Sequence, residues 1–252
     1  MTMQSRTADS PPLIAVAHGS RDPRAAATVE ELLRAVRLAR PDLDVRTAYL
    51  DHAPPTLARA LSGLDEAVVL PLLLTAAYHS RVDIPGALRE ASVRNPRLRV
   101  HRGETLGPHP LLVTALERRL ADAGVTIGAP DTAVVLVSAG SSDRRANAVI
   151  ARMARQWARS RPWWSVTAAY ASAAAPSPAD EVVRLRHAGA SHVVVAPYLL
   201  APGHFADKVE RDGLKAGADV VAGVLGPAPE LVTILLERYA QAVHRSPDVA
   251  TA

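Results

Sequence analysis

Cysteine is absent from the 252-residue sequence, which excludes disulfide bonds, thiolate zinc sites and cysteine-ligated iron–sulfur clusters. Aromatic residues are scarce, at 4% with a single phenylalanine, so few rings are available to stack on nucleic-acid bases. The arginines are spread along the chain and form no basic run. We therefore expect no nucleic-acid partner, although the net charge of +4 suits an anionic small molecule.

The sequence also has no long hydrophobic run. Its longest apolar stretch, residues 67–74, contains a proline and is far shorter than the roughly 18 residues that span a bilayer. Residues 1–10 are polar and lack the apolar centre of a secretory signal. These absences predict a cytoplasmic protein with no membrane partner. Residues 1–11 are expected to be a disordered tail, and residues 244–252 form the C-terminal tail.

Strand-like segments alternate with helix-like segments along the rest of the chain. Residues 13–17 form an apolar run that ends at His18. Gly19 then predicts a turn, and Asp22 followed by Pro23 predicts the start of a helix, because Asp is a preferred N-cap and Pro suits the first helical position. Repetition of this alternation predicts βαβ units and a mainly parallel sheet. The apolar run 67–74 is one of the predicted buried strands.

The second half of the sequence repeats the first. The same residue types recur at an offset of 121 positions, as in Gly19 and Gly140, Tyr49 and Tyr170, and Pro55 and Pro176. A linker with glycine and proline lies between the halves, at residues 123–130. We therefore predict an α/β fold of two similar lobes, residues 12–124 and 131–243. Each lobe is expected to be a mainly parallel four-stranded sheet flanked by helices, with a cleft between the lobes.

The two halves differ at their titratable residues. His18 is replaced by Ala139 in the repeat, and Asp51 is replaced by Ser172. The glycines and prolines that shape the loops are kept. This contrast predicts a single site in the first lobe, with the second lobe as its wall or lid.

A second histidine, His79, follows another strand of the first half and corresponds to His204 or Phe205 in the repeat. Carboxyl ends of parallel strands meet at one sheet edge, where ligands bind. Imidazole is both a metal ligand and a base near neutral pH. His18 and His79, with Asp51 as a candidate third ligand, therefore predict an open metal site, since a structural zinc site would need four ligands.

Simpler readings of these residues exist. A lone histidine beside a helix start is more often a capping or hydrogen-bonding residue than a ligand, and Asp51 is equally a turn residue. The interpretation of His204 is open. Four further histidines are interpreted as surface or loop residues: His52, His101, His187 and His192.

Several motifs together resemble the class II sirohydrochlorin chelatases, in their long, internally duplicated form. The motifs are Ala-His-Gly-Ser-Arg-Asp-Pro at 17–23, Ala-Tyr-Leu-Asp at 48–51 with Pro54-Pro55, Pro-Leu-Leu-Leu at 71–74, Tyr-His-Ser at 78–80 with Asp-Ile-Pro at 83–85, and Leu-Gly-Pro-His-Pro at 106–110. The resemblance extends over residues 12–243. It implies a chelatase-like three-layer sandwich and a tetrapyrrole cleft between the lobes.

The resemblance also implies an activity, the insertion of Fe²⁺ or Co²⁺ into sirohydrochlorin during sirohaem or cobalamin biosynthesis, with Ni²⁺ as a further option. The metal is then a substrate, and no permanently bound cofactor is expected. His18 and His79 carry over as catalytic residues and metal ligands. Asp51 stands where the family usually has Glu. Insertion exchanges two pyrrole N–H protons for a metal ion, and neutral histidine can both release a metal and accept a proton.

The implied substrate carries eight carboxylates, which arginine binds bidentately. Arg21, Arg24 and Arg81 follow the two histidines and are predicted to hold the rim of the substrate; their simpler reading is as solvated arginines at helix starts. Gly19 and Ser20 are expected to let the backbone approach the ligand or to cap the helix.

Three other functions remain open. An α/β hydrolase would need a Gly-x-Ser-x-Gly elbow, which the sequence lacks. A bilobed carrier of an anionic ligand suits two similar lobes, but a periplasmic carrier should have a signal peptide. A non-catalytic metal or tetrapyrrole-binding protein of the same fold differs from the enzyme only in turnover. The oligomeric state, monomer or homodimer, is open as well.

Overall fold

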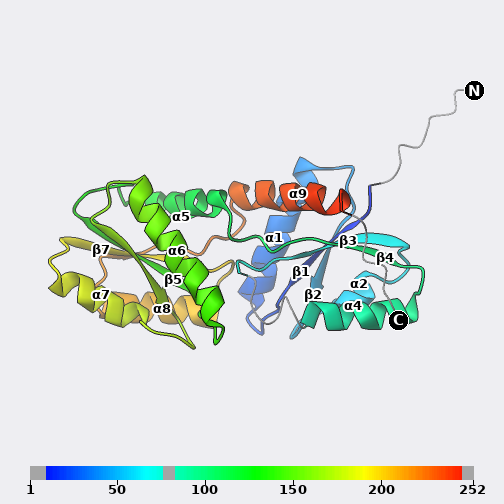
Figure 1. The fold of residues 1–252 in the computed structure, drawn as a ribbon, viewed down its shortest axis with the longest axis horizontal. Helices are drawn as coiled ribbons and strands as arrows, with labels where there is room; N and C mark the ends of the chain where they lie inside the picture. The colour runs from blue at the N-terminus through cyan, green and yellow to red at the C-terminus, as the bar shows by residue number, and fades with distance from the viewer. Residues whose placement is uncertain (1–9, 76–82, 246–252) are drawn as a thin grey trace, which may run out of the picture.

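The protein consists of two lobes that lie end to end along the long axis of the molecule (Figure 1). The computed structural model describes residues 10–75 and 83–245. Most of each predicted tail, residues 1–9 and 246–252, lies outside the described part of the chain.

Each lobe is built on one four-stranded parallel sheet. In the first lobe the strand order is β2-β1-β3-β4, and in the second it is β6-β5-β7-β8. The strands are β1 (Leu13–Ala17), β2 (Val45–Tyr49), β3 (Glu66–Pro71), β4 (Arg99–Arg102), β5 (Thr132–Ser138), β6 (Ser165–Tyr170), β7 (His192–Tyr198) and β8 (Val220–Val221). The matching strand orders confirm the predicted α/β fold with two similar lobes.

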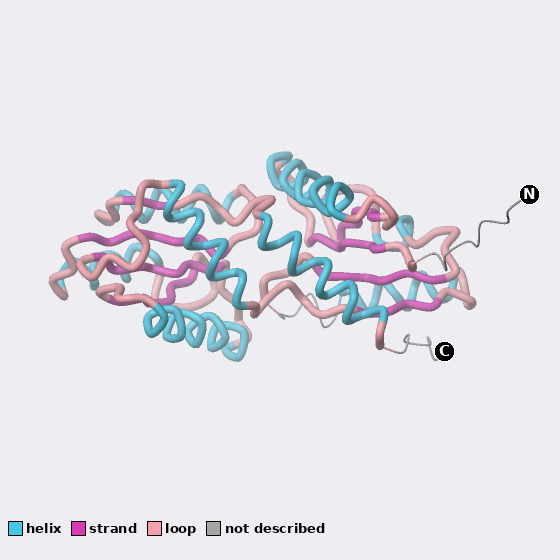
Figure 2. The backbone as a smooth tube through the Cα atoms, turned by 90° about the horizontal axis from the view of Figure 1, so that it is seen from above, coloured by secondary structure: helices cyan, strands magenta, loops and turns pink. Residues whose placement is uncertain are grey.

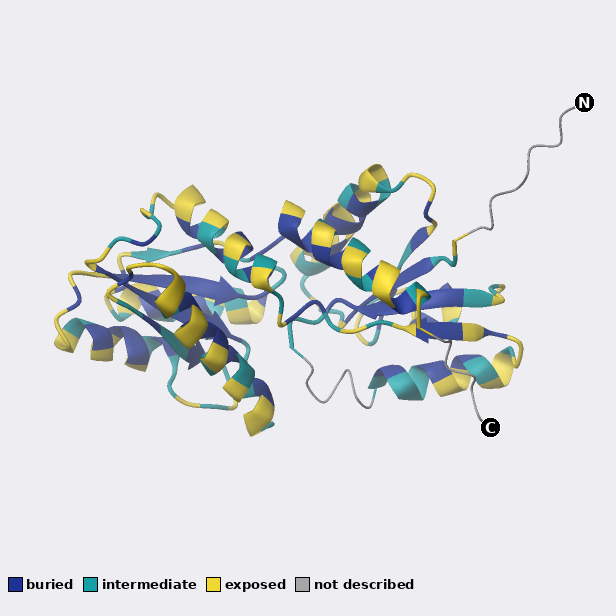
Figure 3. Cartoon of the chain, turned by 45° about the horizontal axis from the view of Figure 1, so that its top comes forward, coloured by how far each residue is buried: buried dark blue, intermediate teal, exposed yellow. Residues whose placement is uncertain are grey.

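The central strands are apolar because helices cover both faces of each sheet. All five residues of β1 and all seven of β5 are buried, and the burial colouring shows the helices exposing only their outer faces (Figure 3). The helices are α1 (Pro23–Ala39), α2 (Leu57–Ala60), α4 (Asp83–Arg94), α5 (Pro110–Asp122), α6 (Arg144–Ser160), α7 (Pro178–His187), α8 (His204–Lys215) and α9 (Pro229–Val243).

The helices that start next to the first strand of each lobe begin in the same way. Asp22 is the N-cap of α1 and accepts a hydrogen bond from the backbone N–H of Arg24, as predicted from the Asp-Pro pair. Asp143 is the N-cap of α6 and accepts one from Arg145. The repeat in the sequence is therefore a repeat in local structure.

The last helix of each half lies on the opposite lobe. Helix α5 ends the first half of the chain but packs against β7 of the second lobe, whereas α9 ends the second half and packs against α1, β3 and β4 of the first lobe. Figure 1 shows green α5 among the second-lobe elements and red α9 above the first-lobe sheet. Seen from above, the two sheets remain separate along the chain's long axis (Figure 2). Each sheet thus depends on the other half for part of its cover.

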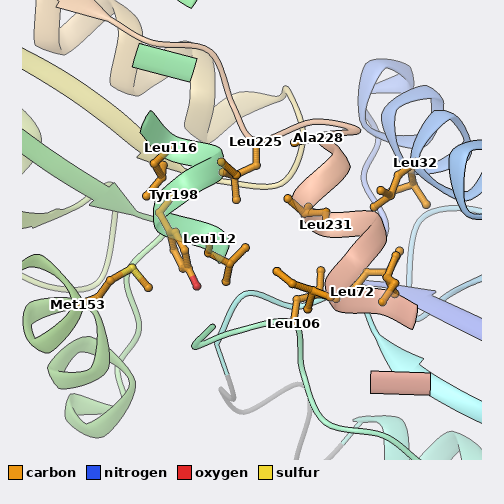
Figure 4. Packing of buried hydrophobic residues seen from close by; sticks show 14 of the residues in the cluster. Leu32, Leu72, Leu106, Leu112, Leu116, Met153, Tyr198, Leu225, Ala228 and Leu231 are labelled. Carbon is orange, nitrogen blue, oxygen red and sulfur yellow. The ribbon is translucent and has the colours of Figure 1, made fainter. Parts of the chain in front are cut away.

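The exchanged helices meet in the middle of the molecule and join the two lobes through one hydrophobic cluster. Leu112 and Leu116 of α5 pack with Leu225 and Leu231, which precede and begin α9 (Figure 4). The same cluster extends from β1 to β5, while separate clusters lie under α2 and α4 and under α7 and α8. Burial of this shared cluster holds the lobes together.

Polar contacts reinforce the exchanged helices. The guanidinium of Arg118 on α5 lies 2.5 Å from Oε1 of Glu230 on α9. Burial of Glu230 raises the pKa of its carboxyl, but the pairing with Arg118, a backbone hydrogen bond and nearby Arg119 together lower it. Glu117 on α5 accepts a hydrogen bond from the Trp157 indole of α6 at 3.0 Å. Helix α5 is therefore tied both to α9 and to the second lobe.

Two expectations from the sequence are corrected. His101 was interpreted as a surface residue, but it is buried in β4, and its Nε2 lies 2.7 Å from Oε1 of Glu66. The apolar run 67–74 is not all strand, because β3 ends at Pro71. The three leucines that follow have left the sheet and line a cavity. Across residues 10–75 and 83–245, no helix is both long and apolar enough to cross a membrane.

The helix exchange predicts that residues 1–124 alone do not form a stable folded monomer, because the face of their sheet that α9 covers would be exposed. We expect this fragment to be unfolded, aggregated or dimeric by light scattering after size-exclusion chromatography. Co-expression with residues 125–252 should restore a soluble complex of the two fragments. A folded, monomeric 1–124 fragment would show that α9 is not needed as cover.

Candidate functional site

The backbone at the end of β1 is tightly constrained. Gly19 has a φ of +96°, and a Cβ atom on it would lie 1.7 Å from the carbonyl oxygen of Asp51, so only glycine fits. The amide of Asp51 donates a hydrogen bond to the carbonyl of His18 at 3.0 Å. This close approach fixes His18 at the carboxyl edge of the sheet.

The second lobe repeats this geometry without the histidine. Gly140 has a φ of +85°, a Cβ there would lie 1.9 Å from the carbonyl oxygen of Ser172, and Ser172 N–H donates to the carbonyl of Ala139 at 2.9 Å. The Ser172 hydroxyl donates to that same carbonyl at 3.0 Å. The scaffold is therefore duplicated, while the imidazole belongs to one lobe.

A cavity of about 510 Å³ lies between these two turns, and both lobes line it. Its volume falls within the roughly 300–1,000 Å³ typical of small-molecule sites. The first lobe contributes His18, Gly19 and Ser20, and the second contributes Ala139, Gly140 and Ser141. The structure thus provides the cleft between lobes that the repeat predicts.

Three helices begin at this cavity. Ala25 in the first turn of α1, Ala146 in the first turn of α6 and Phe205 in the first turn of α8 all belong to its lining. Helix N-termini carry partial positive charge and unsatisfied N–H groups. Their convergence makes the rim of this cavity favourable for an anionic ligand.

Of the predicted site residues, some line the cavity and others lie beside it. His18, Gly19 and Ser20 line the cavity. The hydroxyl of Ser20 accepts a hydrogen bond from the amide of Asp22 at 3.1 Å, so it also shapes the turn before α1. Arg21 is exposed next to this turn.

The carboxylate of Asp51 is directed toward its neighbour in the sequence and is not part of the cavity lining. Its Oδ1 accepts a hydrogen bond from the amide of His52 at 2.7 Å, and its Oδ2 lies 3.2 Å from Nε2 of that histidine. His52 itself has a positive φ of 61°. A metal role for Asp51 would require this side chain to turn away from His52.

His79 and Arg81 lie outside the described residues. The segment that leads to them, Leu72 to Thr75, lines the cavity. Tyr198 of the second lobe donates a hydrogen bond to the carbonyl of Leu74 at 2.9 Å. The second lobe therefore fixes the described end of the segment that continues to His79.

The second lobe forms a wall of the cavity, as predicted, but sequence reasoning did not identify the residues of that wall. Tyr198, Asn147 and Phe205 all line the cavity, and Asn147 braces the turn at Ser141 by donating to its carbonyl at 2.7 Å. The repeat did contain a signal for Tyr198, because residues 195–200 correspond to the apolar segment that begins at Val69 in the first half. Within residues 10–75 and 83–245, no group of three or more His, Cys, Asp or Glu residues could hold a metal ion.

The contact at Gly19 predicts a large loss of stability for Gly19→Ala. We expect the free energy of unfolding to fall by about 3 kcal/mol or more, because the new Cβ meets a backbone oxygen and the φ is strained. Gly140→Ala should cost a similar amount. Gly63→Ala is the control, since Gly63 has a φ of +76° but open space around it, and it should lose only about 1 kcal/mol. Urea denaturation measures all three, and equal losses at Gly19 and Gly63 would contradict the close approach.

Comparison with known proteins extends over most of the chain. A model of the CbiX family matches residues 12–123 and again residues 133–242. The sirohydrochlorin cobaltochelatase of Priestia megaterium is 30% identical over 240 residues, which is 88% of this chain and 77% of that protein. The sirohydrochlorin ferrochelatase of Bacillus subtilis (strain 168) is 25% identical over 245 residues, 93% of this chain and 92% of that protein.

A solved structure agrees with these matches. The structure of SirB from Bacillus subtilis with Fe³⁺ has a TM-score of 0.79 and 25% sequence identity, and the match covers 93% of this chain and 96% of that one. Both halves of the chain match the family model separately, as the internal repeat requires. The chain therefore belongs to the CbiX family.

Proposed function

We propose that this protein is a sirohydrochlorin chelatase, which inserts Fe²⁺ or Co²⁺ into a tetrapyrrole in the cavity between its lobes. The observation that carries the proposal is the position of His18, which lines this cavity from the end of β1 while its counterpart across the cavity is Ala139. The names of the relatives support the same reaction.

Insertion replaces two pyrrole N–H protons by one metal ion. The enzyme must therefore present a metal that it can release and accept protons close to neutral pH. A neutral imidazole fulfils both requirements. We assign the two tasks to His18 and His79 as a pair, with Asp51 as a third candidate ligand if its carboxylate leaves His52.

The cavity suits a flat macrocycle with an anionic rim. Its walls include apolar side chains from both lobes, such as Val29, Leu72 and Ile150, which can cover the faces of a ring. The N-termini of α1, α6 and α8 and the hydroxyl groups of Ser138 and Ser141 lie around it and can accommodate carboxylates. No cofactor is needed for this reaction, because the metal is consumed as a substrate.

The relatives include both a cobaltochelatase and a ferrochelatase, and imidazole ligands accept either metal. An anaerobic absorbance assay with sirohydrochlorin and each metal supplied separately distinguishes them by rate. The same assay separates an enzyme from a binding protein of the same fold, because only the enzyme turns over. Binding of metal and tetrapyrrole without any turnover would overturn the proposed function.

Replacement of either histidine should abolish the reaction. We expect His18→Ala and His79→Ala each to lower the initial rate of metallation by about a hundred-fold or more, because each removes a ligand and a base. Circular dichroism should show an unchanged fold. His187→Ala is the control, since His187 is an exposed residue at the end of α7. A histidine variant that metallates close to the parent rate would remove that residue from the site.

The second lobe is expected to be chemically silent. Substitution of His204, at the start of α8, should change the metallation rate by less than about two-fold, because the proposed ligand pair lies in the first lobe. The measurement is the same absorbance assay. A loss as large as that of His18→Ala would show that both lobes supply catalytic residues.

A further inference from the structure

Arg24 lies between two carboxylates that belong to different lobes. Its Nη2 is 2.6 Å from Oδ2 of Asp22 and 2.6 Å from Oδ2 of Asp207. Asp22 is the N-cap of α1 in the first lobe, and Asp207 lies in the first turn of α8 in the second lobe. The guanidinium therefore connects the starts of two helices across the boundary between lobes.

This contact is at the rim of the cavity. Ala25, the residue after Arg24, lines the cavity, and so does Phe205, two residues before Asp207. The helix starts also approach each other directly, since a Cβ built on Gly203 would lie 3.9 Å from Cβ of Asp22. The Arg24–Asp207 pair thus connects the starts of α1 and α8 next to residues that line the cavity.

The pair is not required to hold the lobes together. The side chain of Arg24 is 53% exposed and that of Asp207 is 49% exposed, and exposed ion pairs add little to stability. The hydrophobic cluster shared by the lobes already provides the connection. Replacement of Asp207 by another carboxylate as the partner of Arg24 therefore costs little free energy.

Asp22 behaves differently from Asp207. It accepts hydrogen bonds from both the backbone N–H and the side chain of Arg24, which lowers the pKa of its carboxyl. Asp22 is thus fixed as an anion next to the guanidinium and orients it. Of the two carboxylates, only Asp207 comes from the other lobe and has no such backbone bond to Arg24.

We infer that Asp207 is an internal competitor for a substrate-binding arginine. In the ligand-free protein Asp207 occupies Arg24, and a carboxylate at the edge of the substrate replaces it while Asp22 keeps the guanidinium in place. The inference rests on the proposed function and assigns Asp207 as a positioning residue that acts through Arg24. It also specifies the ligand class, a substrate with a carboxylate at this edge, because that carboxylate takes the place of Asp207 on Arg24.

Removal of the competing charge should tighten substrate binding. We expect Asp207→Asn to bind metal-free sirohydrochlorin about two- to five-fold more tightly than the parent protein, the range of an exposed ion pair. Absorbance titration gives the dissociation constant. In the metallation assay KM should fall while kcat stays unchanged, since the pair breaks before the chemical step.

Two matched variants separate this role from general charge effects. Asp207→Glu keeps the carboxylate and should bind like the parent protein. Asp212→Asn removes one charge from the same helix, where Asp212 pairs with Lys208, and should not change the affinity. The effect of Asp207→Asn should also shrink as salt concentration rises, because salt screens exposed pairs.

A double-mutant cycle tests whether Asp207 acts through Arg24. Arg24→Gln should weaken binding, and adding Asp207→Asn to that variant should change nothing further. If the parent protein binds sirohydrochlorin but Asp207→Asn has the same affinity as the parent, the inference is wrong and the proposed function stands. If Asp207→Asn tightens binding equally without Arg24, the competitor role is also wrong. If the parent protein binds no sirohydrochlorin, the proposed function fails together with the inference.

Discussion

The interaction on which this structure depends is the contact between the exchanged helices α5 and α9. Each helix covers the sheet of the other half and packs against its partner in the middle of the molecule. Neither sheet is fully covered without both halves, so the apolar area that stabilises one lobe also sets the position of the other. The cavity between the lobes is consequently formed by folding itself. A ligand that binds there meets two walls whose relative position is already fixed.

The close approaches at the strand ends explain which residues could diverge between the halves. Gly19 and Gly140 have no room for a Cβ. The amide of Asp51 donates to the carbonyl of His18, and the amide of Ser172 donates to the equivalent carbonyl of Ala139. The requirement for glycine at positions 19 and 140 therefore comes from backbone geometry and not from the chemistry of neighbouring side chains. The amide-to-carbonyl bonds at these turns involve no side-chain atom of His18 or Ala139. His18 could therefore be kept in one lobe and replaced by Ala139 in the other without altering the scaffold.

The sequence predicted the features that have local causes. Apolar runs, the Asp-Pro helix start and the turn glycine were enough to place His18 at a sheet edge, and the repeat with an offset of 121 residues was enough for two similar lobes. The helix exchange was not predictable in this way, because periodicity shows that a helix has an apolar face but not which sheet it covers. His101 was misjudged for a related reason: its partners, Glu66 on the neighbouring strand β3 and the carbonyl of Arg245, lie far from it in the sequence. The Arg24–Asp207 contact joins residues 183 positions apart and has no local signal either.

Fusion of the two halves has a chemical consequence. In a symmetric dimer of one half, every group at the cavity would appear twice, so histidines would face each other across it. One chain that contains both halves can present His18 on one wall and neutral groups, such as Ser172 and Asn147, on the other. Under the proposed function, a tetrapyrrole between these unlike walls would meet His18 on one of its faces only. A symmetric dimer of one half could not offer this difference between the two faces of the ring.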